Sequence, residues 1–227
     1  MVVPAENCMR LPDNMSYITA AVSTDAVGTL YHAQKKIGYF RKRHACYFFG
    51  LGPMGGAGVM IAKGLGATVI VVDMLDERLN MAKELGADYV INGKDVNVVE
   101  EILRITNGRG ADAAIDCSGS PYAENNALDC VRAHGRVAFI GECKEVTIRP
   151  SEQLIRKQIT VTGSWYFPIQ EFEEIADFIV KKELPVEKKL VTHTFKLEEA
   201  ETAFRMFDEK KNRKKSGICL GISNHII

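Results

Sequence analysis

Short runs of apolar and β-branched residues alternate with helical patterns through the middle of the chain. Each run is apolar at successive positions, which is typical of parallel strands covered by helices on both faces. The predicted strands are residues 45–49, 68–72, 89–91, 111–115, 136–140 and 159–162. The predicted helices between and after them are residues 54–65, 77–85, 98–106, 122–133 and 151–157, the last with Ser151 as its N-cap.

Six β–α steps over roughly 120 residues predict an α/β fold with a doubly wound parallel sheet of the Rossmann type. Right-handed crossovers leave few other topologies for this order of elements. Several of the helical patterns end at a glycine, the residue that most easily adopts the left-handed conformation found after a helix. The expected sheet therefore has six strands and helices on both faces.

The two ends of the chain depart from this alternation. Residues 1–24 contain Pro4 and Pro12 within turn-forming segments, and Leu184-Pro185 follows a predicted helix at residues 170–183. A strand at 190–195, a helix at 197–208 and a strand at 217–222 come after it. We expect residues 25–188 to form the sheet domain, with 1–24 and 189–227 as parts of a second domain.

The overall charge does not favour a polyanionic partner. Lys plus Arg and Asp plus Glu both number 29, so no global field favours nucleic acid or an anionic membrane. The basic run Lys210–Lys215 is interpreted as a solvated turn after a helix, with a phosphate-binding patch as the alternative. A nucleic-acid-binding function would rest on this run alone.

The cysteines and the apolar segments favour a cytoplasmic protein. The six cysteines form no Cys-x-x-Cys pair and have irregular spacing, which is typical of free thiols in a reducing compartment. No stretch approaches the roughly 20 apolar residues of a membrane span. The N-terminus lacks the basic and apolar regions of a signal peptide.

The most informative segment is a glycine-rich turn between the first predicted strand and the next helix. Gly50, Gly52 and Gly55 fit the pattern G-x-G-x-x-G. In that pattern the first glycine makes the turn, the second admits a pyrophosphate and the third packs the helix on the strand. Pro53 suits the first helical turn, and the free amides of that turn attract an anion.

An acidic residue follows the second predicted strand at the spacing that dinucleotide sites use. Asp73 lies 18 residues after Gly55, close to the ~20 expected of the acid that bonds the adenosine ribose. Its carboxylate would repel a 2′-phosphate, which favours NAD over NADP, although the nearby Arg78 could accommodate that phosphate. The alternative is a glycine-rich helix start, with Asp73 capping the next helix.

Several segments together resemble the medium-chain dehydrogenase/reductase family, and within it the zinc-dependent alcohol, polyol and threonine dehydrogenases. They are the Gly50–Gly55 turn, Ile70-Val71-Val72-Asp73, Ala82-Lys83-Glu84-Leu85-Gly86-Ala87-Asp88, Asp116-Cys117-Ser118-Gly119 and Gly135-Arg136-Val137. The resemblance extends from about residue 2 to residue 208, and it is the series of motifs that makes it specific.

The resemblance implies roles for particular positions in cofactor binding and in metal binding. It places Asp73 and Arg78 at the adenosine ribose, and Thr29 and Met54 near the nicotinamide. The remaining cofactor positions that it implies are Gly50, Gly52, Pro53, Gly55, Ser118, Ile140, Gly141, Gly163 and Ser164. Asp25 stands where the family often has a Cys or Glu zinc ligand, and a helix-capping Asp is the alternative.

Other family features are missing from the sequence. The family has an N-terminal GroES-like catalytic domain with a catalytic Cys and a Gly-His-Glu segment, and often a structural zinc lobe with four Cys; none of these motifs occurs here. A catalytic zinc needs about three protein ligands, which Asp25 alone does not provide. His32 could face the nicotinamide or the core, and His134 is expected at a helix end. No catalytic residue is identified.

The resemblance implies hydride transfer between a secondary alcohol and NAD, with zinc acting on the alcohol oxygen. We expect this chain to supply the NAD-binding part of that enzyme and to be incomplete as a catalyst. The alternatives are a non-enzymatic nucleotide-binding fragment and a zinc-independent, NADPH-dependent quinone-type reductase. The strand at 159–162 would be the sheet edge, through which we expect a homodimer.

Overall fold

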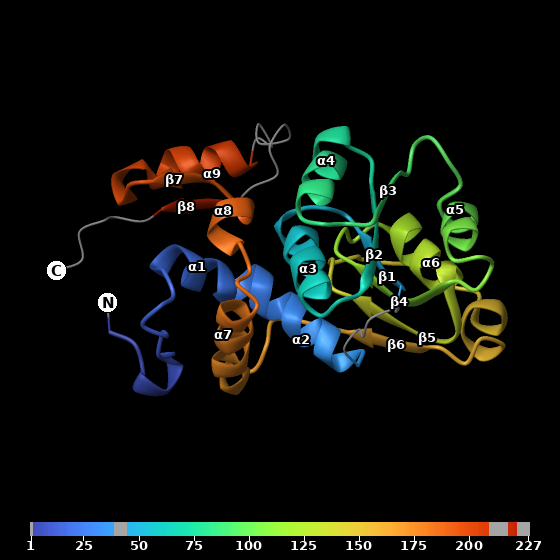
Figure 1. Ribbon diagram of the computed structural model, residues 1–227, viewed down its shortest axis with the longest axis horizontal. Helices are drawn as coiled ribbons and strands as arrows, with labels where there is room; N and C mark the ends of the chain where they lie inside the picture. Colours follow the sequence, from blue (N-terminus) through green and yellow to red (C-terminus); the bar gives the residue numbers. More distant parts are fainter. Residues whose placement is uncertain (1, 39–44, 209–217, 222–227) are drawn as a thin grey trace.

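A six-stranded parallel sheet forms the centre of the computed structural model, which describes residues 2–38, 45–208 and 218–221 (Figure 1). Its strand order is β3-β2-β1-β4-β5-β6, the order of the doubly wound dinucleotide-binding fold. The strands are β1 (Ala45–Phe49), β2 (Thr68–Asp73), β3 (Tyr89–Asn92), β4 (Ala111–Asp116), β5 (Val131–Phe139) and β6 (Thr160–Gly163). The predicted fold class is confirmed.

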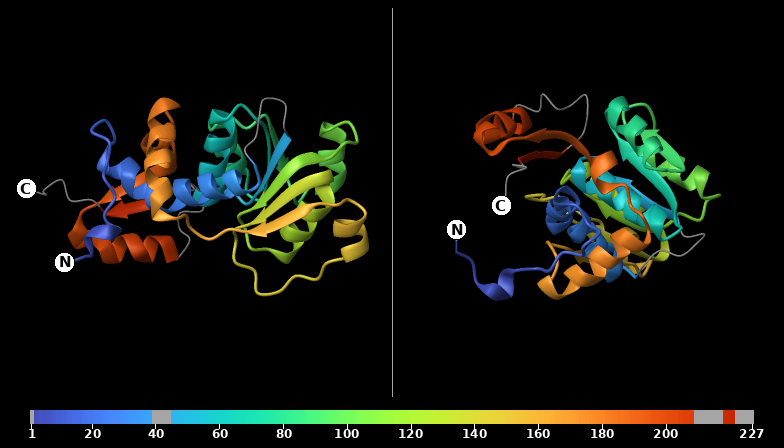
Figure 2. Two further views of the ribbon diagram at one scale, coloured as in Figure 1. Left: turned by 90° about the horizontal axis from the view of Figure 1, so that it is seen from below. Right: turned by 60° about the vertical axis from the view of Figure 1, so that its left-hand side comes forward.

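Helices cover both faces of this sheet (Figure 2). Alternate strand residues face opposite ways, so Phe48 belongs to one core cluster and Phe49 to the other. The first cluster contains residues of α2 (Gly28–Lys36), α3 (Pro53–Gly64), α4 (Asp76–Glu84) and α7 (Phe172–Lys181). The second contains residues of α5 (Val98–Ile105) and α6 (Pro121–Cys130). In β2 and β4 the residues on both strand faces are therefore buried, as the unbroken apolar runs predict, whereas Val161 of the edge strand β6 is exposed.

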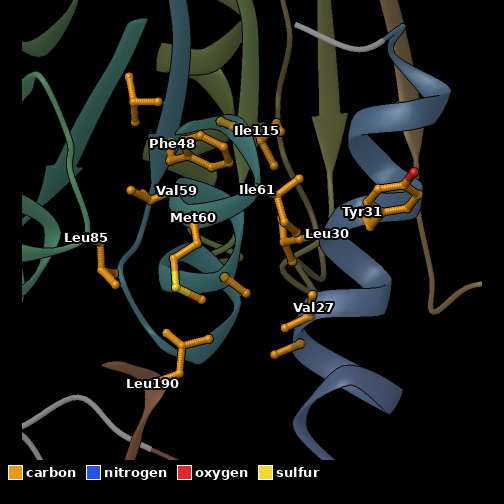
Figure 3. Packing of buried hydrophobic residues seen from close by; sticks show 14 of the residues in the cluster. Val27, Leu30, Tyr31, Phe48, Val59, Met60, Ile61, Leu85, Ile115 and Leu190 are labelled. Carbon is orange, nitrogen blue, oxygen red and sulfur yellow. The ribbon is translucent and has the colours of Figure 1, made fainter. Parts of the chain in front are cut away.

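The first core cluster fixes the helix that follows the glycine-rich turn. Ile61 of α3 faces Leu30 and Val27 of the α2 region, and Phe48 and Ile115 supply the sheet side of this layer (Figure 3). All five side chains are completely buried. Since burying a large aliphatic or aromatic side chain contributes about 1.5–3 kcal/mol, this layer holds α3 in a defined position against the sheet.

The helix predicted at residues 122–133 is confirmed, but its predicted end at residue 133 is wrong. Helix α6 ends at Cys130, and Val131 begins strand β5 by pairing with Ala111 of β4. The Arg132 guanidinium bonds Asp112 of β4 at 2.6 Å, a contact across strands that no local pattern contains. His134 therefore lies within β5 with φ 58°, and not at a helix end.

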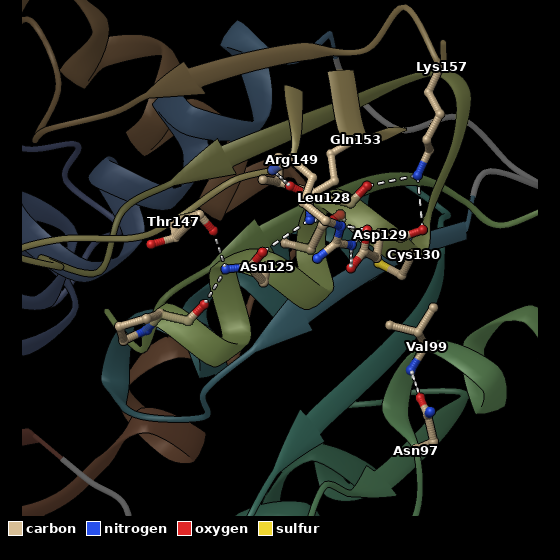
Figure 4. Close-up of polar contacts among 12 residues, drawn as sticks. Asn97, Val99, Asn125, Leu128, Asp129, Cys130, Thr147, Arg149, Gln153 and Lys157 are labelled. Carbon is tan, nitrogen blue, oxygen red and sulfur yellow. Dashed lines mark hydrogen bonds and ion pairs between the residues drawn. The ribbon is translucent and has the colours of Figure 1, made fainter. Parts of the chain in front are cut away.

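The Ser151 cap is also wrong, because the helical segment is a π-helical turn over Pro150–Ile155 that begins after Arg149. Gln153 holds this turn: its side chain accepts from the Arg149 amide at 2.7 Å and donates to Asn125 and Asp129 of α6 (Figure 4). The buried Gln153 side chain thus satisfies the Arg149 amide at the start of the turn.

A second, two-stranded parallel sheet lies apart from the first one (Figure 1). It pairs β7 (Val191–Phe195) with β8 (Ile218–Gly221). The nearby helices are α1 (Tyr17–Val22), α8 (Val186–Leu190) and α9 (Ala200–Asp208). Lys210–Lys215 lies outside the described residues, and the boundaries proposed at residues 24/25 and 188/189 stay a prediction. Among the described residues, no helix has the length and apolar character needed to cross a membrane.

Candidate functional site

The glycine-rich turn lies at the carboxyl edge of the sheet, between β1 and α3. Strand β1 ends at Phe49, and α3 begins at Pro53 with Gly52 as its N-cap residue. β1 pairs with β2 on one side and β4 on the other, so the winding of the chain reverses here. Ligands of doubly wound sheets bind at this switch point.

The glycines of the turn have different physical roles. A Cβ at Gly55 would lie 1.9 Å from the Gly50 carbonyl oxygen, so only glycine permits this close packing of helix on turn. A Cβ at Gly52 would meet no other heavy atom within 4 Å. Gly55 is therefore required by the fold, whereas Gly52 leaves open space in front of the helix N-terminus. The amides of the first turn of α3 have no acceptor within the helix.

Asp73, the last residue of β2, is joined to this turn. Its Oδ2 accepts from the Leu51 amide at 2.7 Å, and its Oδ1 accepts from the amides of Met74 at 2.7 Å and Leu75 at 3.0 Å. The Arg78 guanidinium approaches Oδ2 at 3.4 Å. An ionised carboxylate has about four acceptor positions, and these four donors use them. The Arg78 contact is the longest of the four, so a donor that comes closer to Oδ2 would displace it.

A third turn follows β4 beside the first two. Asp116 is completely buried and accepts from the Ser118 hydroxyl at 2.6 Å, the Ser118 amide at 3.1 Å and the Gly119 amide at 2.9 Å. Burial raises the pKa of the Asp116 carboxyl, although these three donors oppose the rise. Asp116 thus fixes the backbone that carries Ser118 at the carboxyl edge.

A cavity of about 540 Å³ opens between these three turns. We call it the β1–β2 cavity. Its lining residues are Phe49, Gly50, Pro53, Val72, Asp73, Met74, Leu75, Arg78, Gly93, Val98, Ser118, Ser120, Tyr122, Ala123, Asn126 and Phe207. The Arg78 Nε and the Asn126 Nδ2 are buried without a hydrogen-bond partner. The cavity thus has mainly apolar walls, with a carboxylate and unused donors among them.

A second hollow, of about 620 Å³, lies at the ends of β5 and β6. We call it the β5–β6 hollow. Its lining includes Ile140, Gly141, Gly163 and Ser164, together with His32 of α2. His32 Nδ1 lies 2.9 Å from the Glu171 carboxylate, so the side chain lines the hollow and is paired at the same time. The Ser164 hydroxyl is buried without a partner.

The structure brings most of the predicted cofactor positions to one of these two spaces. Five of them line the β1–β2 cavity: Gly50, Pro53, Asp73, Arg78 and Ser118. Four others line the β5–β6 hollow: Ile140, Gly141, Gly163 and Ser164. Gly52 and Gly55 lie in the turn itself.

Besides Gly52 and Gly55, three predicted residues line neither space. Thr29 is buried in α2 with an unpartnered hydroxyl, and Met54 in the first turn of α3 packs against the core. Asp25 lies exposed in the π-helical segment Ser23–Val27. Within residues 2–38, 45–208 and 218–221, no three His, Cys, Asp or Glu side chains are grouped to hold a metal ion. A zinc ion on Asp25 would need ligands from elsewhere.

Some lining residues were missed by sequence reasoning. Tyr122, Ala123 and Asn126 occupy one side of α6 at helical spacing, but this spacing alone does not show which side of the helix faces the sheet. Phe207 of α9 lines the same cavity, but it is far from the motif in sequence and no local signal connects them.

Comparison with known families places the chain among dehydrogenases. The family model described as "Zinc-binding dehydrogenase" matches residues 53–181, which is more than half of the 227 residues. The chain belongs to this zinc-binding dehydrogenase family. The resemblance noted from the sequence motifs is thereby confirmed.

Individual relatives agree with this assignment. The zinc-type alcohol dehydrogenase-like protein YphC of Escherichia coli is 34% identical over 93% of this chain and 60% of the relative. The sorbitol dehydrogenase of Halalkalibacterium halodurans is 30% identical over 90% and 60%, respectively. The 2R,3R-butanediol dehydrogenase structure from Bacillus subtilis has a TM-score of 0.83 at 27% identity, covering 95% of this chain and 60% of that one. The chain thus spans about three fifths of these proteins.

Proposed function

We propose that this chain binds NAD(H) at the carboxyl edge of its sheet, as the cofactor part of an alcohol or polyol dehydrogenase. The observation that carries the proposal is the open space at Gly52, in front of the amides of α3 and beside the Asp73 carboxylate. Backbone amides at a helix N-terminus bind a pyrophosphate, and the carboxylate binds the ribose hydroxyls next to it.

The β1–β2 cavity suits the adenosine half of this cofactor. A ribose hydroxyl is a better-placed donor to Asp73 Oδ2 than Arg78 at 3.4 Å, so ribose binding would release the guanidinium. A 2′-phosphate at the same place would meet the carboxylate, which supports NAD over NADP. NADPH and a quinone-type reduction are the alternative, since the released Arg78 could pair with that phosphate.

The β5–β6 hollow suits the nicotinamide half. Ser164 has a buried hydroxyl without a partner, and the backbone at Ile140 and Gly141 lines the same hollow. A carboxamide has two donors and two acceptor positions, which such hydroxyl and backbone groups satisfy. Together these groups would hold the nicotinamide ring in one orientation.

The bound cofactor would exchange a hydride with the carbon of a secondary alcohol, and this chain would orient the nicotinamide for it. We propose that the chain alone binds NADH without turning over alcohol, since Asp25 is its only proposed zinc position. The substrate class follows from relatives named as sorbitol and butanediol dehydrogenases. Zinc bound in stoichiometric amount together with alcohol-dependent NADH formation would contradict the inactivity. A non-enzymatic NAD-binding module would show binding alone. A cytoplasmic location is part of the same proposal.

Fluorescence of the single tryptophan tests NADH binding directly. Trp165 is the only tryptophan of the chain and lines the β5–β6 hollow beside Ser164. Reduced nicotinamide absorbs at the wavelengths where tryptophan emits, so we expect NADH to quench Trp165 with saturation, and NAD⁺ to quench it far less. NADPH should need at least a tenfold higher concentration, about 1.4 kcal/mol weaker binding. Titrations without saturable quenching, supported by calorimetry without heat, would reject the proposal.

The edge strand of the sheet supports a homodimer. β6 pairs with β5 alone in the described sheet, and Val161 on it is exposed. An uncovered edge strand presents unpaired backbone groups to another copy. We expect light scattering to give a dimer at micromolar concentration and a monomer for Val161→Lys, because a charge on an edge opposes pairing. An unmodified chain with the mass of a monomer would contradict this.

A further inference from the structure

One wall of the β1–β2 cavity comes from outside the six-stranded sheet and its covering helices. Phe207 belongs to α9, which contacts β8 of the second sheet. Its side chain nevertheless lines the same cavity as Asp73 and Arg78. The cofactor pocket is therefore formed by two parts of the chain that are far apart in sequence.

The chemistry of this wall suits a flat aromatic ligand. Met74, Leu75, Val98 and Tyr122 give the cavity its apolar surface. Phe207 is 56% exposed, so an apolar ring faces solvent beside that surface. Planar bases stack on aromatic side chains, which removes apolar area of both from water. A purine base entering the cavity would cover the exposed face of Phe207.

We propose that Phe207 is a cofactor-binding residue that stacks on or against the adenine base and closes the adenosine subsite. This rests on the proposed binding of NAD(H). Asp73 and the α3 amides hold the ribose and the phosphates, while Phe207 adds affinity through the base. Phe207 is contributed by the C-terminal segment, and it would make adenosine binding depend on where α9 lies.

A neighbouring residue offers a matched control. Phe204 lies one helical turn before Phe207 on α9 and is 77% exposed, yet it does not line the cavity. Both replacements remove an exposed aromatic ring from the same helix. A general effect on α9 would appear in both variants, whereas an effect on the adenosine subsite would appear in the Phe207 variant alone.

The experiment is calorimetric titration of the full chain with AMP and with NADH. We expect Phe207→Ala to raise the dissociation constants of both ligands about tenfold, at the lower end of measured stacking effects. Phe204→Ala should stay within about twofold of the unmodified chain, and Phe207→Trp should restore binding. Equal affinities for the Phe207→Ala and unmodified chains would overturn this inference alone. An unmodified chain that binds neither ligand would overturn the proposed function and this inference with it.

Discussion

Replacing Gly52 with valine is expected to lower NADH affinity at least 100-fold while leaving the folded structure intact. A Cβ there meets no other heavy atom within 4 Å, and the backbone at φ −70° is allowed to any residue. The valine would instead occupy the space in front of the α3 amides. Losing two hydrogen bonds to a charged phosphate costs about 1.5–3 kcal/mol each, which amounts to at least two orders of magnitude in affinity.

Calorimetry and thermal unfolding together check this expectation. Gly52→Val should unfold within a few degrees of the unmodified chain, since surface substitutions change stability by about 0.5 kcal/mol. Gly55→Ala is the contrasting variant, because its Cβ would lie 1.9 Å from the Gly50 oxygen and should lower stability as well as binding. Unchanged NADH affinity in Gly52→Val would show that the pyrophosphate does not bind at this turn.

Replacing Asp73 with serine is expected to reverse the cofactor preference. The substitution removes the negative charge, and the Arg78 guanidinium loses the carboxylate that it approaches at 3.4 Å. Arg78 is then free to pair with a 2′-phosphate, an interaction of about 1.5–3 kcal/mol. The ratio of NADPH to NADH affinity should rise about 100-fold, with NADH weakened and NADPH strengthened.

The ratio of affinities is the appropriate measurement, because Asp73 also has a structural role. Its carboxylate accepts from the Leu51, Met74 and Leu75 amides, so the serine variant should lose stability of about 1–3 kcal/mol. A stability loss affects both cofactors alike and cancels in the ratio. Asp73→Asn keeps an acceptor for two of these amides and serves as the control. An unchanged ratio in both variants would remove Asp73 from the ribose site.

Local sequence signals predicted most of the fold and the central part of the site. Apolar runs marked all six strands of the main sheet, most clearly β2 and β4, whose residues are buried on both faces. The Gly50–Gly55 turn and Asp73 were found because a turn, a close approach and a charge each require a specific residue. The end of α6 was misplaced, since Val131 suits a helix or a strand and its pairing with Ala111 decides between them.

The rest of the site depends on contacts between distant segments. Asn126 reaches the β1–β2 cavity because α6 packs on the sheet, and Phe207 reaches it because α9 lies beside the sheet domain. The residue types of Asn126 and Phe207 do not by themselves indicate that these side chains line the cavity. The helical turn likewise begins after Arg149 and not at Ser151, where Gln153 joins it to Asn125 and Asp129 of α6. Such pairings follow from tertiary packing, which the local pattern does not encode.

The bond from the Leu51 amide to Asp73 joins the two sides of the site within the protein itself. The turn proposed to bind the phosphates and the carboxylate proposed to bind the sugar are thus preorganised. A ligand that enters such a site does not have to order a loop first, so little conformational entropy is lost on binding. Affinity at this edge of the sheet then reflects the contacts that the ligand makes, and association requires no loop rearrangement.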